Sequence, residues 1–185
     1  MPDEPASVPP GSKEAGFYTW HSDRTLLVWL VGGVVLVVTI PTLLKARVSK
    51  NESAAIGDVR TVISAEAAFR SMAGNYGSPE CLAAPSSAGC VAGYPATAPT
   101  FVDSSIGSLR TKGGYERAFV AGIPSPTEKS PRGVGTYCYS AFPATVGQTG
   151  VRSFAGDQTG RICFDPEGRS LCTAGGLPTG CALLE

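Results

Sequence analysis

The chain has 185 residues, which is the length of one domain with or without an appendage. It carries 15 lysines and arginines against 15 aspartates and glutamates, and this zero net charge argues against a nucleic-acid-binding protein. Charged residues make up only 16% of the chain, while a hydrophobic content of 43% excludes a wholly disordered protein. The single histidine, His21, leaves almost no material for histidine-based metal or triad chemistry.

An uncharged segment follows a polar N-terminus. Residues 1–24 are rich in proline, and we interpret them as a flexible N-terminal tail or an atypical leader. Residues 25–44 contain no charge, and a helix of that length rises about 30 Å, the thickness of a bilayer core. A buried helix of a soluble protein is disfavoured because every face is apolar, and a cleaved signal because no small-x-small site follows. We therefore expect a transmembrane helix half over 25–44, with a kink or local melting at Pro41.

Residues 45–73 are predicted to continue as an amphipathic helix half that ends in turn residues at 74–77. Its larger apolar side chains recur at steps of three and four, which predicts one broad stripe that needs a partner surface. These side chains are Ile56, Val59, Val62, Ile63, Phe69 and Met72. Asp58 and Glu66 also fall within the stripe, and we expect Glu66 to pair with Arg70 one turn later.

All six cysteines follow the apolar segment. They are Cys81, Cys90, Cys138, Cys163, Cys172 and Cys181. No Cys-x-x-Cys is present, so zinc ribbons, thioredoxin-type sites and c-type haem attachment lack their local signature. An even number of cysteines in a Gly- and Pro-rich region favours three disulfides in an oxidising compartment over six reduced thiols. This places the C-terminal part outside the cytoplasm, although the basic residues that follow the apolar segment would weakly favour the opposite orientation.

Residues 74–185 are predicted to form a β-rich extracytoplasmic head, which makes the fold class α+β. The candidate strands lie at 114–121, 136–142, 151–155 and 161–164, with a hairpin turn at 157–160. Successive strands at these intervals predict an antiparallel meander whose apolar face covers the stripe of the long helix. Packing within the sheet core is the favoured role for Tyr115, Tyr137 and Tyr139. Proximity predicts the disulfides Cys81–Cys90 and Cys172–Cys181 as local loops, and Cys138–Cys163 between neighbouring strands.

Six segments of the chain carry a joint resemblance to a known family: 40–52, 64–70, 75–79, 101–106, 112–115 and 157–160. Together they resemble the bacterial type IV pilins and the related pseudopilins. In that family an apolar helix reaches an Ile-Pro-Asn-Leu-Leu-like step, then a basic patch, and then an amphipathic half. The resemblance implies a subunit that is held in the inner membrane as a single-pass protein before assembly. It is then extruded into a helical filament whose core is formed by the apolar helices.

The resemblance also implies processing of the N-terminus. A typical prepilin is cut between a Gly and a Phe, so Gly16-Phe17 is a possible leader-cleavage site. Aligning Pro41 with the proline of the family's helix and counting back to the family's cleavage point places the mature start at Trp20 instead. In the family a glutamate lies near the start of the mature chain. With the start at Trp20, Arg24 occupies that position and Asp23 lies beside it. We hypothesise that Asp23 takes over the role of the glutamate.

The function expected from the resemblance is that of a structural subunit of a type IV pilus or pseudopilus-like filament. A minor subunit of such a filament is included in this expectation. The alternative is a non-polymerising, membrane-anchored envelope protein with a pilin-like binding head. The implied partners are other pilin-like subunits through helix packing, the lipid bilayer, a prepilin peptidase and the pilus assembly platform. A charge within the stripe, such as Glu66, would be free to meet a neighbouring subunit.

We expect neither an enzyme nor a cofactor. The chain has no nucleophile-elbow, metal-binding or phosphate-loop motif. Pseudopilin relatives can hold calcium in their last loops, where this chain has Asp157, Asp165 and Glu167. Solvated turn carboxylates are the favoured interpretation of these three residues.

Overall fold

The computed structural model describes residues 20–174 and 176–184, without the side chains of residues 20–24, 26 and 34–41. The chain divides into two compact units, Met1–Thr42 and Leu43–Glu185. The helix α1, Trp20–Ala73, contributes to both of them and is continuous through Pro41. The kink at Pro41 stays a prediction, because the two units meet at Thr42 and each is described by itself.

The first unit is described only by the N-terminal part of α1. Within the described residues, none of the helices combines the length and the apolar character that crossing a membrane requires. The predicted tail, the cleavage pair Gly16-Phe17, and the side chains of Asp23 and Arg24 all lie outside the described residues. The same holds for the side chains at 34–41 in the middle of the predicted membrane segment.

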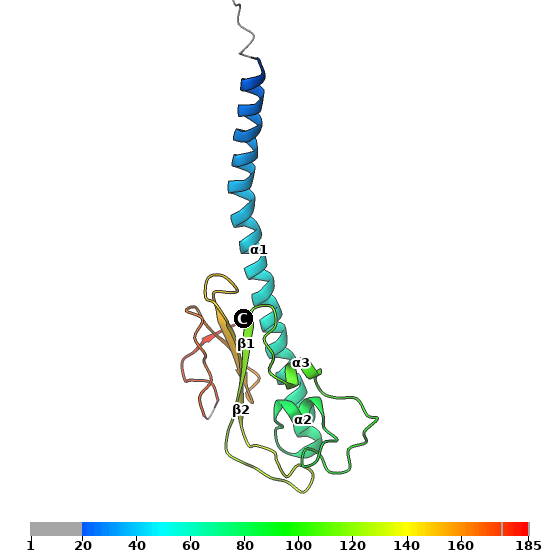
Figure 1. Ribbon diagram of the computed structural model, residues 1–185. Coiled ribbons are helices and arrows are strands. Elements are labelled where there is room, and N and C mark those ends of the chain that lie inside the picture. The colour runs from blue at the N-terminus through cyan, green and yellow to red at the C-terminus, as the bar shows by residue number, and fades with distance from the viewer. Residues whose placement is uncertain (1–19, 175, 185) are drawn as a thin grey trace, which may run out of the picture. The chain divides into compact units, whose positions relative to one another are not determined.

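The second unit is an α+β head, in agreement with the predicted class. Its described residues form a five-stranded antiparallel sheet in the order β1-β2-β3-β4-β5, which confirms the meander. The strands are β1 Tyr115–Ala121, β2 Tyr137–Pro143, β3 Ser153–Asp157, β4 Ile162–Asp165 and β5 Ala182–Leu183. Two short helices precede the sheet, α2 Pro79–Ala83 and α3 Ser104–Gly107. β1 and β2 lie beside the C-terminal part of α1 (Figure 1).

The predicted end of the long helix is confirmed at Ala73. Gly74 has φ 83°, a left-handed conformation that glycine adopts without the steric cost of a Cβ atom. Its N–H donates to the carbonyl of Arg70 at 2.8 Å and so satisfies one of the last free carbonyls of α1.

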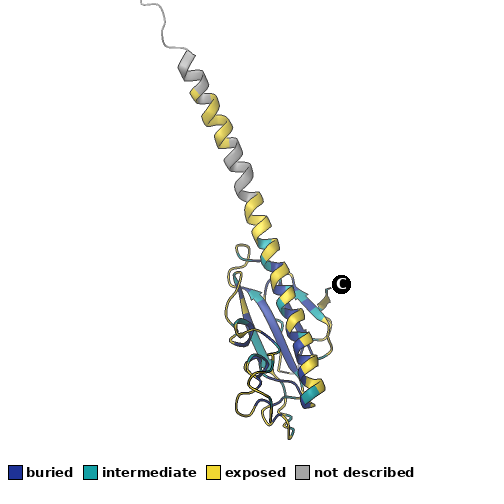
Figure 2. Cartoon of the chain, turned by 90° about the vertical axis from the view of Figure 1, so that its right-hand side faces the viewer, coloured by how far each residue is buried: buried dark blue, intermediate teal, exposed yellow. Residues whose placement is uncertain are grey.

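The core lies between the stripe of α1 and the sheet. Val59, Val62 and Phe69 are fully buried there, as are Tyr139 and Phe154 on the sheet. Figure 2 shows the sheet largely buried, while the part of the helix beside it alternates between buried and exposed residues. The predicted core role of Tyr115, Tyr137 and Tyr139 is confirmed, since none of the three is more than 2% exposed.

Helix and sheet approach each other closely at Gly156 of β3. A Cβ atom at this position would lie 2.6 Å from Cδ1 of Ile63 and 2.9 Å from Cγ1 of Val59. Carbon atoms in proteins do not approach a Cβ atom this closely, so a larger residue at position 156 would force Ile63 and Val59 to shift.

Three disulfides are present, as predicted, but only Cys81–Cys90 has the predicted pairing. The pairs predicted as Cys138–Cys163 and Cys172–Cys181 are wrong, and the structure has Cys138–Cys172 and Cys163–Cys181 instead.

The reason for the wrong pairing is the strand order. Cys138 on β2 pairs with Asp157 of β3, and Cys163 on β4 pairs with Ala155 of the same strand. Because β3 lies between them, the two cysteines are about 10 Å apart, beyond the reach of a disulfide of about 7 Å.

We expect non-reducing peptide mapping to recover these pairs. The Cys138–Cys172 bridge closes a sequence separation of 34 residues, so replacing both cysteines with serine should lower the free energy of unfolding by about 4 kcal/mol. The matched change at Cys81 and Cys90, with a separation of 9 residues, should cost about 2–3 kcal/mol. A peptide that links Cys138 to Cys163 would contradict the register of β2, β3 and β4.

Candidate functional site

The N-terminal part of α1 exposes a continuous apolar surface. Five successive side chains are each at least 60% exposed: Leu27, Val28, Trp29, Leu30 and Val31. Five consecutive residues cover more than one full helical turn, so apolar groups point in every direction around the axis. Residues 27–31 therefore leave no polar side of the helix to direct toward water. An exposed apolar surface of this kind is typical of sites that interact with a membrane or with another protein.

In the second unit, the three carboxylates of α1 are all turned toward the head. Glu52 is the first of them. Its Oε1 accepts hydrogen bonds from the N–H groups of Val151 and Arg152, both at 3.1 Å. Its Oε2 accepts from Nη2 of Arg152 at 2.7 Å. Burial alone would raise the pKa of Glu52, but the hydrogen bonds and charge of Arg152, together with the N–H of Val151, hold this pKa below its usual value.

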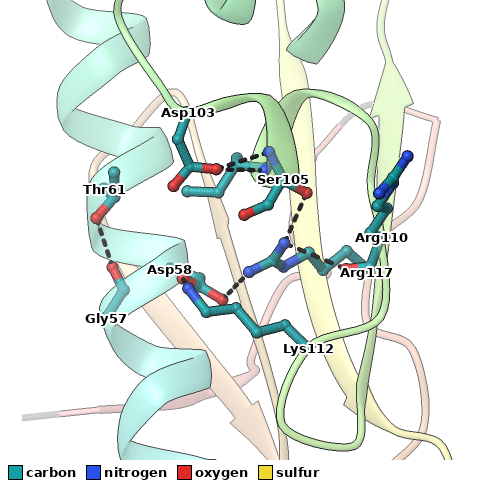
Figure 3. Close-up of polar contacts among 9 residues, drawn as sticks. Gly57, Asp58, Thr61, Asp103, Ser105, Arg110, Lys112 and Arg117 are labelled. Atoms are coloured by element: carbon teal, nitrogen blue, oxygen red, sulfur yellow. Dashed lines mark hydrogen bonds and ion pairs between the residues drawn. The ribbon is translucent and has the colours of Figure 1, made fainter.

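Asp58 is the second carboxylate and forms a buried ion pair with Arg117 of β1 (Figure 3). The Arg117 side chain is 1% exposed and also donates to the carbonyls of Ser105 at 2.8 Å and Arg110 at 3.2 Å. Lys112 lies on the other side, with its Nζ 3.7 Å from Oδ1 of Asp58. The guanidinium therefore joins α1, β1 and the segment around α3.

Sequence reasoning missed the role of Arg117, although a signal for it was present. Arg117 has the same strand parity as Tyr115 and Phe119, so it belongs to the face of β1 that looks toward the helix. Asp58 lies within the apolar stripe of the helix. An acid and a base on two facing apolar surfaces predict a buried pair, because neither charge tolerates burial alone.

Glu66 is the third carboxylate and is fully buried. Its Oε2 accepts a hydrogen bond from the N–H of Gly77 at 2.9 Å, while Oε1 has no hydrogen-bond partner among the described residues. Burial raises the pKa of Glu66 to about 8, and the N–H of Gly77 offsets only part of this effect. The expected pair of Glu66 with Arg70 is wrong.

Arg70 instead donates to the hydroxyl of Tyr76 at 2.6 Å and lies with its guanidinium carbon 5.0 Å from the centre of the Tyr76 ring. Because Glu66 is enclosed by its own chain, the expectation that it meets a neighbouring subunit is also wrong.

The outer face of α1 in this unit is consequently basic. The exposed charged residues between Leu43 and Ala73 are Lys45, Arg47, Lys50, Arg60 and Arg70. The acidic residues of the same stretch are the three that face the head. The zero net charge of the whole chain therefore hides a strong local imbalance, since one face of this helix part presents cations only.

The three carboxylates considered for calcium do not converge. In the register of β3 and β4, Asp165 pairs with Ser153, so Asp157 lies at the opposite end of β3, about 13 Å away. Asp165 and Glu167 instead form ion pairs with Arg169, at 3.2 and 3.1 Å. No cluster of three metal-ligating side chains is present in the part of the chain that the structure describes.

Comparison with protein-family models, with curated proteins and with solved structures finds no match to this chain. The functional argument therefore rests on the residues of the chain itself.

Proposed function

We propose that this protein is a structural subunit of a type IV pilus or pseudopilus-like filament that assembles through its apolar N-terminal helix. In this proposal residues 25–44 hold the subunit in the inner membrane before assembly, and the head lies outside the cytoplasm. The observation that carries the proposal is the apolar surface at 27–31, which faces all sides of the helix.

The physics of such a helix favours an exchange between lipid and protein. An uncharged helix is tolerated in a bilayer and equally among copies of itself, so little free energy separates the two environments. The three disulfides of the head support its proposed location in an oxidising compartment outside the cytoplasm, because disulfides persist in such compartments. Charged residues begin again only at Lys45, two residues after the start of the head unit at Leu43.

The test is fractionation of cells that produce the full chain, followed by determination of the intact mass and the N-terminal residue in each fraction. A filament subunit is expected in sheared surface material and should begin at Phe17 or Trp20. We expect Leu30→Glu to remove the protein from this material, because a charge at the centre of an apolar helix costs about 3 kcal/mol. The matched control is Ile123→Glu, which adds the same charge to an exposed apolar residue of the head and should leave the sheared fraction unchanged.

A full-length chain confined to the membrane fraction would overturn the filament proposal in favour of the anchored alternative. That alternative is a non-polymerising envelope protein whose head binds a partner, and Arg24 at the family's glutamate position is the residue that favours it. A chain found only in the soluble fraction would overturn both.

A further inference from the structure

The start of α1 in the head unit and the loop between β2 and β3 form one continuous surface, which we call the basal patch. It consists of Leu43, Leu44, Lys45 and Arg47 of α1, and of Val146 and Val151 of the loop. All six are exposed, including the four large apolar side chains.

Two grooves bring four of these residues together, and Leu43 and Val146 are the chain neighbours of Leu44 and Gly147, which line both grooves. Leu44 and Arg47 line one of about 740 Å³ with Gly147 and Gln148 of the loop. Leu44 also lines a second groove of about 410 Å³, with Lys45, Gly147 and Val151. Leu44 thus lies between two grooves that the helix shares with the same loop.

The loop is held against the helix by the residues that follow the basic ones. Nδ2 of Asn51 donates to the carbonyl of Thr149 at 2.8 Å. The carboxylate of Glu52 accepts from the N–H groups of Val151 and Arg152. These three hydrogen bonds therefore fix the position of the loop relative to the part of α1 that carries Lys45 and Arg47.

The charge of the patch is unbalanced. Lys45 and Arg47 form no ion pair with any residue that the structure describes, and the one nearby carboxylate, Glu52, is buried and bound to Arg152. Cations interleaved with exposed Leu and Val side chains match the headgroup layer of an anionic bilayer, which offers phosphates and an apolar boundary. A contact in which two copies meet through this same patch fits less well, since it would bring like charges together.

We propose that the basal patch binds an anionic phospholipid surface. Lys45 and Arg47 contact lipid phosphates, and Val146 and Val151 enter the interfacial layer. This inference rests on the membrane anchoring in the proposed function, because an apolar segment that ends at Leu44 brings the headgroup layer to the next residues. It adds to that function a second contact with the membrane, made by the head itself.

The experiment uses the full chain reconstituted into vesicles of phosphatidylcholine alone or with one quarter phosphatidylglycerol. Flotation measures anchoring, and hydrogen exchange of the loop 144–152 measures docking. We expect the chain to float with both kinds of vesicle, and we expect the loop to exchange about tenfold more slowly when phosphatidylglycerol is present. One basic residue near an anionic surface contributes roughly a fivefold preference, so Lys45→Gln with Arg47→Gln should abolish the difference. Molar salt should abolish it as well.

The matched control is Lys129→Gln with Arg132→Gln, two exposed cations of a distant head loop, which should retain the slow exchange. Val146→Asp should lose it without a change of net charge on the helix. A chain that floats with both vesicles but shows the same loop exchange in each would overturn this inference and leave the anchoring intact. A chain that floats with neither would overturn the anchoring and, with it, this inference.

Discussion

Replacing Asp58 with alanine is expected to lower the free energy of unfolding by about 3–5 kcal/mol, because the change leaves the buried guanidinium of Arg117 without its counter-charge. Arg117 keeps its hydrogen bonds to the carbonyls of Ser105 and Arg110, but neither carries a full negative charge. Lys112, which now lies 3.7 Å from Asp58, would add repulsion between like charges. Urea unfolding of the full-length protein, followed by circular dichroism, measures the effect.

Two further variants isolate the pair. Glu116→Ala removes an exposed carboxylate from the neighbouring position of β1, and its effect should stay within about 0.5 kcal/mol. Adding Arg117→Met to Asp58→Ala removes both charges together and should recover most of the loss. If Asp58→Ala costs no more than Glu116→Ala, the buried pair does not hold the helix to β1.

The second large effect is expected at Glu66, whose pKa of about 8 lies well above the model-compound value of 4.5. The folded state binds the proton more tightly than the unfolded chain does. The stability that this group contributes is therefore fully present below pH 4.5 and is lost as the pH rises through 8. One pKa unit corresponds to about 1.4 kcal/mol, so the loss across this window has an upper limit of about 5 kcal/mol.

Glutamine at position 66 resembles the protonated acid and does not titrate. Glu66→Gln is thus expected to flatten the dependence of stability on pH between 5 and 8, and to make the protein more stable than the unchanged chain at pH 8.5. Glu80→Gln is the matched control, since it alters an exposed carboxylate near the end of α1 and should leave the slope as it was. Identical slopes for the Glu66→Gln variant and the unchanged chain would mean that Glu66 is charged in the folded state.

The pH window of Glu66 is separate from that of Glu52 and Asp165. The pKa values of Glu52 and Asp165 are both lowered, which follows from their hydrogen bonds to Arg152 and Arg169, even though burial opposes the shift. Groups of this kind stabilise the fold above their unfolded pKa and lose that contribution as the pH falls. Their effect therefore belongs to acid conditions, below the range in which Glu66 acts.

Local patterns predicted most of the secondary structure. The stripe of α1 has a period near 3.6 residues, and the strand segments alternate between bulky and small residues, so both could be found without knowledge of the fold. α2 and α3 were missed although each has a local capping signal. Ser78 precedes Pro79 at the start of α2, and Oδ1 of Asp103 accepts from the N–H groups of Ser105 and Ile106 at the start of α3. β5 has two residues, too few for any pattern.

Tertiary neighbours could not be predicted in the same way. The disulfide partners depend on β3 lying between β2 and β4, and the partner of Glu66 depends on how the turn after α1 folds back. Spacing along the chain favoured Arg70 for Glu66, because residues four apart are neighbours on a helix surface. Burial of Glu66 against the head removed it from that surface, and Arg70 bound Tyr76 instead.

The strand order of the sheet has a consequence for the synthesis of the chain. Each strand pairs with the next one in sequence, so the hairpins can form as they emerge. The helix, by contrast, is made first, and the ion pair of Glu52 can form only after Arg152 has been made, 100 residues later. At about 5–20 residues per second, its apolar stripe stays uncovered for roughly 5–20 s. The head is therefore complete only when the sheet has closed over the helix, after Arg152 has been made.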